Sequence, residues 1–197
     1  MKIFVIGRQC SGKTDILNEC EELGMSVGRE FCNLDSPNLH IDPKYEKYSM
    51  DDINKIFENN AYVCISGVDE KGILDGYMGY RGISSYTYDN SEVMLLHPQQ
   101  VCSLNMGAIK DDVLFVWVDN NRDNRIHKYA EHNYKYDFVE LEDVESQCDS
   151  DFIKTVYNFP NSKILYFNNE DPGRVAAIIY ALSKHQDLVD VFASKFN

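Results

Sequence analysis

The sequence predicts an α/β fold in a single domain, built on a parallel β-sheet with helices on both faces. Short runs of β-branched and aromatic residues alternate with segments of helical spacing, which is the order that produces such a sheet. The 197 residues fit one domain, and an apolar fraction of 44% is enough for a sizeable core. The first apolar run also ends at a glycine-rich turn that leads directly into a helical segment. These three observations together predict the fold class.

The first expected strand and helix follow each other closely. Residues 2–6 are a β-branched and aromatic run, typical of a strand buried on both faces. From Lys13 onward, apolar residues recur at helical spacing, and Gly24 stands where a glycine favours the end of a helix. A second, weaker strand is expected at 25–32.

The middle of the chain predicts a small lobe rather than more core. Residues 33–50 contain two prolines and many polar residues and are expected to be irregular, and Asp51 is expected to cap a short helix. A strand at 61–66 leads into a turn at 67–72. The chain from that turn to Asn90 is rich in tyrosine and glycine, and we expect it to form a small β-hairpin lobe.

The last part of the chain returns to alternating strands and helices. A proline at the first helical position, followed by apolar residues at helical spacing, makes the final helix the clearest of all. Strands are expected at 93–96, 113–118 and 163–167, and helices at 98–106, 121–132, 143–157 and 172–184.

Composition excludes several classes of protein. The net charge of −13 argues against general nucleic-acid binding, which needs clustered positive charge. The six cysteines and five histidines are scattered, without the spacing of a zinc site. The first apolar run is too short for a signal peptide or a membrane span. We therefore expect a reduced, cytoplasmic enzyme that does not associate with a membrane.

The turn after the first strand carries the pattern GxxxxGK[ST], which is made of Gly7, Arg8, Gln9, Cys10, Ser11, Gly12, Lys13 and Thr14. Its glycines let successive backbone N–H groups face a phosphate, and the following helix adds its positive N-terminal end. Lys13 is expected to reach the β- and γ-phosphates, and the Thr14 hydroxyl to bind Mg²⁺. The position of Cys10 near a helix N-terminus predicts a lowered thiol pKa. The motif predicts binding of a nucleoside triphosphate.

Two arginines follow the strand at 113–118. Arg122 and Arg125 are spaced i, i+3, which places them on one face of a helix. Arginines that close over a phosphoryl group stabilise the charge on its equatorial oxygens during transfer. We expect both to act with Lys13 in catalysis; the alternative is a solvated helix face with acidic partners.

The phosphate loop and these arginines resemble those of the nucleoside monophosphate kinases, guanylate kinases in particular. Residues 7–14 match the family's phosphate loop, and 74–81 look like its glycine-tyrosine-glycine stretch. The arginine pair stands where the family keeps its lid arginines. Residues 167–171 resemble the end of the family's last strand, whose loop borders the ATP base, which implies that Asn168 contacts the base.

The resemblance implies a P-loop kinase fold with a five-stranded parallel core, a small monophosphate-binding lobe and a lid. It places the core at 1–32, 91–120 and 160–197, the lobe at about 33–90 and the lid at about 121–140. It further implies ATP as phosphoryl donor, Mg²⁺ as cofactor, and a nucleoside monophosphate as acceptor, in a monomer or homodimer.

The expected acceptor site consists of Arg29, Glu70, Tyr77, Tyr80 and Arg81. Arg29 either grips the acceptor phosphate or forms a surface ion pair. Glu70 either accepts hydrogen bonds from a guanine edge or lies in water, and the two tyrosines either contact the ligand or pack within the lobe. The family usually has two arginines after a threonine pair, and here the arginines of this region are Arg29 and Arg81.

A second departure from the family lies at the end of the strand at 93–96. The family typically has an acidic residue there, which helps to hold Mg²⁺ through water, and this chain has His97. Asp119 and Asp69 are candidate substitutes. These two departures from the family bear on the identity of the acceptor and on turnover. The expectation of nucleotide binding does not depend on them.

The sequence therefore predicts an ATP-dependent nucleoside monophosphate kinase, with guanine or a deoxynucleotide as the leading acceptor. Alignment, Mg²⁺, Lys13 and the arginines are expected to provide catalysis. Two alternatives remain. One is a P-loop kinase for another acceptor, either a small hydroxyl compound or a base within DNA. The other is a guanylate-kinase-like binding module without turnover.

Overall fold

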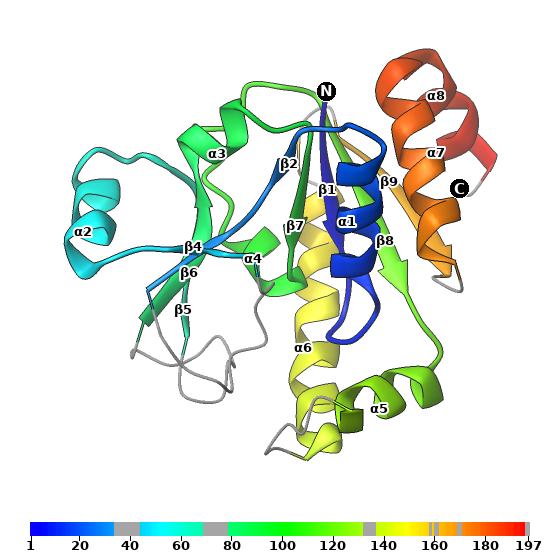
Figure 1. The fold of residues 1–197 in the computed structure, drawn as a ribbon, viewed down its shortest axis with the longest axis horizontal. Coiled ribbons are helices and arrows are strands. Elements are labelled where there is room, and N and C mark those ends of the chain that lie inside the picture. The colour runs from blue at the N-terminus through cyan, green and yellow to red at the C-terminus, as the bar shows by residue number, and fades with distance from the viewer. Residues whose placement is uncertain are drawn as a thin grey trace.

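The computed structural model describes residues 1–33, 44–68, 79–131, 137–157, 159, 162–168 and 171–195. Within these residues the chain forms two sheets (Figure 1). The larger has five strands in the order β2-β7-β1-β8-β9, all parallel. Its strands are β1 (Lys2–Ile6), β2 (Val27–Gly28), β7 (Val93–Leu96), β8 (Val113–Asp119) and β9 (Ser162–Asn168). The expected five-stranded parallel sheet is confirmed.

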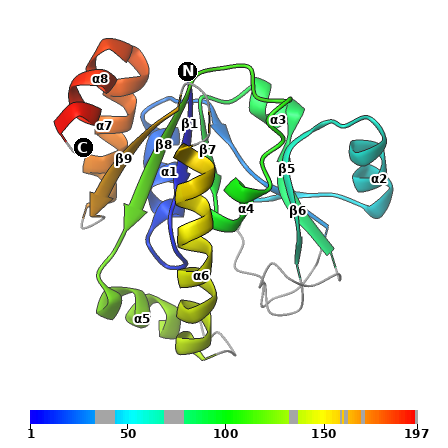
Figure 2. The ribbon, with the colours of Figure 1, turned by 180° about the vertical axis from the view of Figure 1, so that it is seen from behind.

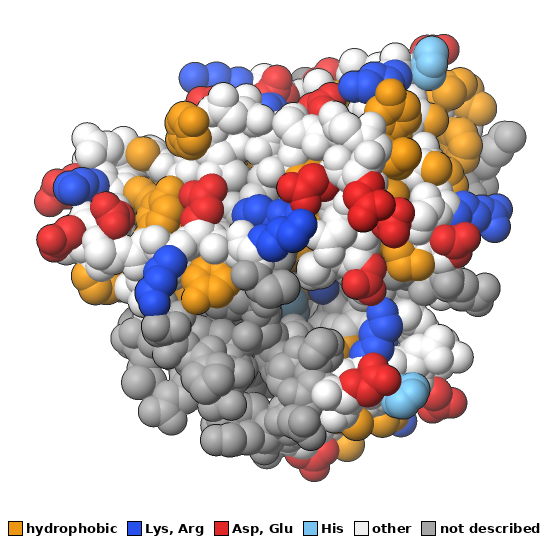
Figure 3. Space-filling view, in the orientation of Figure 1, with side chains coloured by type: hydrophobic (Ala, Val, Ile, Leu, Met, Phe, Trp, Pro, Cys, Tyr) orange, Lys and Arg blue, Asp and Glu red, His pale blue; other side chains and the backbone are white. Residues whose placement is uncertain are grey.

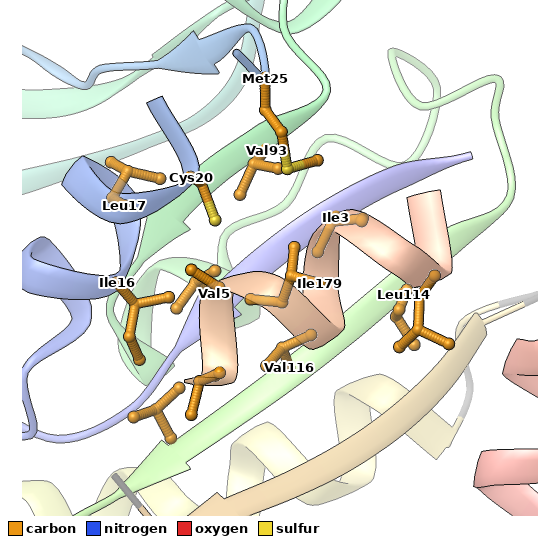
Figure 4. Packing of buried hydrophobic residues seen from close by; sticks show 14 of the residues in the cluster. Ile3, Val5, Ile16, Leu17, Cys20, Met25, Val93, Leu114, Val116 and Ile179 are labelled. Atoms are coloured by element: carbon orange, nitrogen blue, oxygen red, sulfur yellow. The ribbon is translucent and has the colours of Figure 1, made fainter. Parts of the chain in front are cut away.

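Helices cover both faces of this sheet, as expected (Figures 1 and 2). One face packs against α1 (Lys13–Glu22), α7 (Pro172–Lys184) and α8 (Gln186–Lys195), and the other against α6 (Phe138–Tyr157). Alternation along β1 divides its side chains between the two layers. Ile3 and Val5 join the α1 and α7 layer, which Figure 4 shows from close by, whereas Phe4 and Ile6 face α6.

The middle of the chain forms the smaller sheet, in the order β4-β3-β6-β5. Its strands are β3 (Phe31–Cys32), β4 (Glu46–Lys47), β5 (Tyr62–Val68) and β6 (Gly79–Ser84). The antiparallel pairing of β5 with β6 agrees with the expected hairpin. Helix α2 (Met50–Glu58) packs on this sheet, where Phe31, Ile53 and Ile56 form a separate apolar cluster.

Several boundaries differ from the expected ones. The strand expected at 25–32 is two short strands, because the chain leaves the large sheet after β2 and enters the small sheet at β3. Helix α2 is capped by Ser49 instead of Asp51: the Ser49 hydroxyl accepts the Asp52 N–H at 3.2 Å, and the Asp52 carboxylate accepts the Ser49 N–H at 3.0 Å.

Three further elements were not expected from the sequence. They are β4, α8 and the short α3 (Ser85–Asp89), which begins after the capping residue Ser84. Helix α6 begins at Phe138, ahead of the expected start, and α4 (Pro98–Cys102) ends before the expected Met106. Helix α5 (Arg122–Glu131) lies close to its expected place. None of these differences changes the order of the core strands.

The surface carries charges of both signs. On the face seen in Figure 3, the described acidic and basic side chains lie intermixed instead of gathering into regions of one sign. Among the helices of the described residues, none is long and apolar enough to cross a membrane.

Candidate active site

The phosphate loop connects β1 to α1 at the carboxyl edge of the large sheet. A Cβ atom on Gly7 would lie 2.1 Å from the carbonyl oxygen of Val118, so the loop passes β8 more closely than any side chain allows. Gly12 has a φ of 88°, in the left-handed region that favours glycine. Both glycines of the motif are therefore required by the backbone path of the loop.

Lys13 begins α1 and turns back into the curve of the loop. Its Nζ donates to the carbonyl oxygen of Arg8 at 2.6 Å, and the residue is 9% exposed. Burial lowers the pKa of Lys13 to about 8, while the negative charge of Glu145 acts in the opposite direction. Thr14 follows in the first turn of α1 and is partly buried, and Ser11 is buried inside the loop. The loop therefore encloses one ammonium group at the start of a helix.

The thiol pKa of Cys10 is shifted in the direction opposite to the expected one. Its φ is 59°, which a non-glycine residue rarely adopts. Burial raises the pKa of its thiol to about 11, although Lys13 and Arg125 act to lower it. The expected lowering by the helix N-terminus is thus wrong, because desolvation of the thiolate outweighs the nearby positive charges.

The arginines of α5 have different surroundings. Arg125 is 2% exposed and donates from Nε to the carbonyl oxygen of Gln9 at 2.9 Å. Arg122 lies at the surface and holds the Glu142 carboxylate at 2.9 Å. Of the two expected catalytic arginines, the structure brings Arg125 against the phosphate loop and leaves Arg122 beside α6.

A row of carboxylates on α6 faces these cations. Glu142, Glu145 and Asp149 are spaced i, i+3 and i+7, which places them on one side of the helix. Glu142 also lies 3.7 Å from the Arg125 guanidinium, and Asp149 forms an ion pair with Arg8 of the loop. This face of α6 therefore meets the phosphate loop and α5.

Glu145 is the most enclosed of these carboxylates, with 1% of its side chain exposed. Its Oε1 accepts the backbone N–H of Gln9 at 2.5 Å and lies 3.6 Å from His97 Nε2, and its Oε2 accepts from Arg125 at 2.5 Å. Burial alone would raise the pKa of Glu145, but these three contacts together lower it, so the group is a carboxylate. Burial lowers the pKa of His97, which favours the neutral imidazole.

The expected acceptor arginines are held in ion pairs beside the small sheet. Arg81 reaches the Glu30 carboxylate through Nε at 2.7 Å and Nη2 at 2.5 Å, and all of these groups are buried. Gln100 donates to the same carboxylate at 3.1 Å. Arg29 donates to Asn18 at 3.1 Å and to Glu21 at 2.8 Å.

Of the three other expected acceptor residues, Tyr80 is the one that lies within the described part of the chain. The Tyr80 ring packs edge-on against Phe57, with centroids 5.4 Å apart, and its backbone N–H donates to Asn33 at 2.6 Å. Glu70, Tyr77 and Asp69 lie outside the described residues. Tyr80 is therefore placed in the packing of the lobe, which was one of its two expected roles.

An open pocket of about 550 Å³ lies between the ends of β8 and β9 and helix α6, and its lining residue Asp149 pairs with Arg8 of the phosphate loop. Asp119 and Asn168, which are partners in the β8–β9 register, both line it. Its walls are aromatic: the Trp117 ring lies 4.8 Å from Phe152 and 6.3 Å from Tyr166, measured between centroids. The rest of its lining is Asn120, Asn121, Asp149, Ile153 and Phe167.

Two observations bear on metal binding. In the described part of the chain, no group of three or more histidine, cysteine, aspartate or glutamate side chains is placed to hold a metal ion. The loop does provide what Mg²⁺ with a nucleotide needs, namely a hydroxyl at Thr14 and a phosphate cradle with a buried lysine. The residues present fit a cation that is bound mainly through phosphate.

Comparisons with known proteins return a structural likeness and nothing from sequence. No family model matches the chain, and no curated relative matches it. Among solved structures, a guanylate kinase from Anaplasma phagocytophilum matches 94% of this chain and 85% of its own length, with a TM-score of 0.49 and 10% identity. Likeness at this level carries no conclusion about activity.

Proposed function

We propose that this chain transfers the γ-phosphoryl group of ATP to a nucleoside monophosphate, with Mg²⁺ as cofactor. The observation that carries the proposal is the phosphate loop, whose two glycines adopt the required backbone and whose Lys13 ammonium points into the curve. No base is needed to activate the acceptor, because a phosphate is already anionic. The fold then has to align two phosphates and stabilise the charge between them.

The donor site consists of the loop and the pocket beside it. The backbone N–H groups of 7–14 and the Lys13 ammonium hold the phosphates, and the Thr14 hydroxyl holds the cation. A bound Mg²⁺ neutralises charge on the β- and γ-phosphates. The donor base lies in the pocket, where Trp117 and Tyr166 offer aromatic faces and Asn168 and Asp119 offer polar groups to its edge.

Arg125 is the arginine that reaches the transferring phosphoryl group. It already lies against Gln9 in the loop, so a small movement of its guanidinium places it on an equatorial oxygen. Arg122 has a longer path from the surface, and its proposed role is to help α5 close as the lid.

A second candidate is phosphoryl transfer to a small hydroxyl compound. One observation favours it: Arg29 and Arg81, the expected ligands of an acceptor phosphate, each already hold a carboxylate. A monophosphate has to compete with Glu21 or Glu30 for them, whereas an uncharged acceptor does not.

The test is to incubate the protein with ATP and Mg²⁺ and a panel of ribo- and deoxynucleoside monophosphates, with separate small hydroxyl compounds, and to resolve the products by mass. A diphosphate from one monophosphate supports the main proposal, and a phosphorylated hydroxyl compound supports the second. ATP binding without any product contradicts both and favours a binding module. Lys13→Ala is the inactive control, and Lys154→Ala, which removes an exposed lysine paired with Asp151, is its matched control.

A further inference from the structure

The Glu145 carboxylate lies among the groups that the proposed function assigns to the terminal phosphate. It accepts the N–H of Gln9 at 2.5 Å and the guanidinium of Arg125 at 2.5 Å. Of the charges that act on Lys13, that of Glu145 has the largest effect on its pKa. A loop amide and the Arg125 guanidinium thus both bind this internal anion, whose charge also acts on the loop lysine.

We propose that Glu145 is an internal substitute for the terminal phosphate, which the incoming nucleotide has to displace. The inference rests on the proposed function. A carboxylate that accepts a loop N–H makes the same charge-assisted hydrogen bond that a phosphate oxygen makes. Two anions cannot share these partners, because like charges a few ångströms apart repel strongly in a poorly solvated site.

The carboxylate is well suited to hold this place. Its pKa is lowered, so it stays ionised at neutral pH, and it is almost wholly buried. Without it, the buried Arg125 side chain would keep one anionic partner among the described residues, Glu142 at 3.7 Å. Glu145 therefore keeps the loop and Arg125 charge-compensated while no nucleotide is bound.

Helix α6 contacts the site at two further points, one on either side of Glu145. Glu142, in the first half of the helix, pairs with Arg122 of α5, and Asp149, just past the middle, pairs with Arg8 of the loop. Farther along the helix, Phe152 and Val156 are buried in the core. Figure 2 shows this first half of α6 extending past the sheet to lie beside α5. We infer that release of Glu145 involves this half of α6 and leaves its second half in place.

The consequence is an exchange of partners. In the free protein Arg125 binds Glu145, and in the complex it binds the terminal phosphate. A nucleoside diphosphate, which lacks that phosphate, leaves Glu145 in place and binds without the exchange. Displacement of the Glu145 carboxylate thus offsets part of the favourable free energy of triphosphate binding.

The experiment compares ATP binding in the presence of Mg²⁺, by calorimetry at physiological salt, between wild type and Glu145→Gln. The amide keeps the size of the side chain and an oxygen for the Gln9 N–H, so the loop stays occupied in the free protein. Loss of the charge is expected to tighten ATP about tenfold, with a smaller gain for ADP. Asp143→Asn, at an exposed position of the same helix, removes the same charge and is expected to change neither.

Glu145→Asp provides a second variant if the amide fails to fold. It keeps the charge but shortens the reach by one methylene, so ATP is expected to bind a few-fold more tightly. Gains no larger than that of Asp143→Asn, or weaker ATP binding in both Glu145 variants, overturn the inference and leave the proposed function standing. If neither wild type nor the variants bind ATP, the nucleotide site itself is wrong and the inference falls with it.

Discussion

Arg125 Nε donates a 2.9 Å hydrogen bond to the carbonyl oxygen of Gln9, which lies 116 residues earlier in the chain. This bond joins α5 to the phosphate loop. The same guanidinium holds the buried Glu145 carboxylate of α6. One side chain thus connects the loop, the helix proposed as lid and the helix that covers the sheet.

Arg125→Ala is expected to lower the free energy of unfolding by about 3 kcal/mol, because it leaves Glu145 buried without its guanidinium partner. Arg122→Ala removes a solvent-screened surface ion pair and is expected to change the free energy of unfolding much less. In turnover, both should reduce kcat more than they weaken ATP binding, and Arg125→Ala should do so more strongly. Urea unfolding and steady-state kinetics measure the two effects. An unchanged kcat in Arg122→Ala removes that residue from the proposed lid.

Lys13→Ala is expected to abolish turnover, by at least about 100-fold, with the fold intact. The fold is expected to tolerate the loss of this lysine, because burial of its ammonium is unfavourable to the free protein and lowers its pKa to about 8. Product formation and circular dichroism are measured side by side. ADP formation within a few-fold of wild type contradicts the assignment of the loop.

The core of the fold could be predicted from the sequence because its signals are local. The run at 2–6 is a strand with those same bounds, and the proline-led helix lies at Pro172–Lys184 as expected. The two-residue strands have no comparable signal, since β2 exists through its pairing with β7 and β3 through its pairing with β6. Helix α8 has apolar residues that pack on the core, but only one non-helical residue, His185, separates it from α7. Its start therefore has no clear signal in the sequence.

The candidate site likewise has one part with a local sequence signal and one part that depends on how the helices pack. The phosphate loop is a contiguous motif, so its residues follow from the sequence alone. Glu145 does not, because three acidic residues on one helix face look the same whether that face meets water or a phosphate loop. A signal was present in the acidic spacing of α6 after an arginine pair, but its meaning depends on where α6 packs.

Binding of ATP is expected to weaken as the pH rises above about 8. Lys13 in the free protein loses its proton near that pH, and only the ammonium attracts a phosphate. A bound anion raises the pKa of Lys13, so binding near pH 8 takes up protons. Calorimetry in two buffers of different ionisation enthalpy measures this uptake, and Lys13→Met is expected to abolish it. An affinity that stays constant between about pH 7.5 and 9.5 contradicts the prediction.

The lowered pKa of Lys13 also makes the stability of the free protein depend on pH. The folded-state pKa of about 8 lies below the ordinary value of 10.5, so the unfolded chain binds more protons between these two values. The contribution of Lys13 to stability is therefore unfavourable below pH 8 and becomes less so as the pH rises toward 10.5. Wild type should gain stability relative to Lys13→Met across this window, as urea unfolding at several pH values would measure.

The Arg81–Glu30 pair is expected to be structural in the free protein. Among the described residues, Arg81→Met leaves the buried Glu30 carboxylate with Gln100 as its side-chain donor, and it should cost about 3 kcal/mol. Adding Glu30→Met removes the unpaired charge, so the double variant should be more stable than Arg81→Met alone. A double-mutant cycle by urea unfolding tests this, and additive losses would show that the two side chains are not coupled.

ATP is expected to quench the fluorescence of Trp117. This is the single tryptophan of the chain, and it lines the pocket proposed for the donor base together with Tyr166. A base that enters the pocket lies near the indole, whereas inorganic tripolyphosphate occupies only the loop. ATP should therefore change the emission, and tripolyphosphate, at saturation measured by calorimetry, should change it much less. Equal changes with both ligands would place the base elsewhere and would indicate that the second half of α6, whose Phe152 packs on the indole, also moves when phosphates bind.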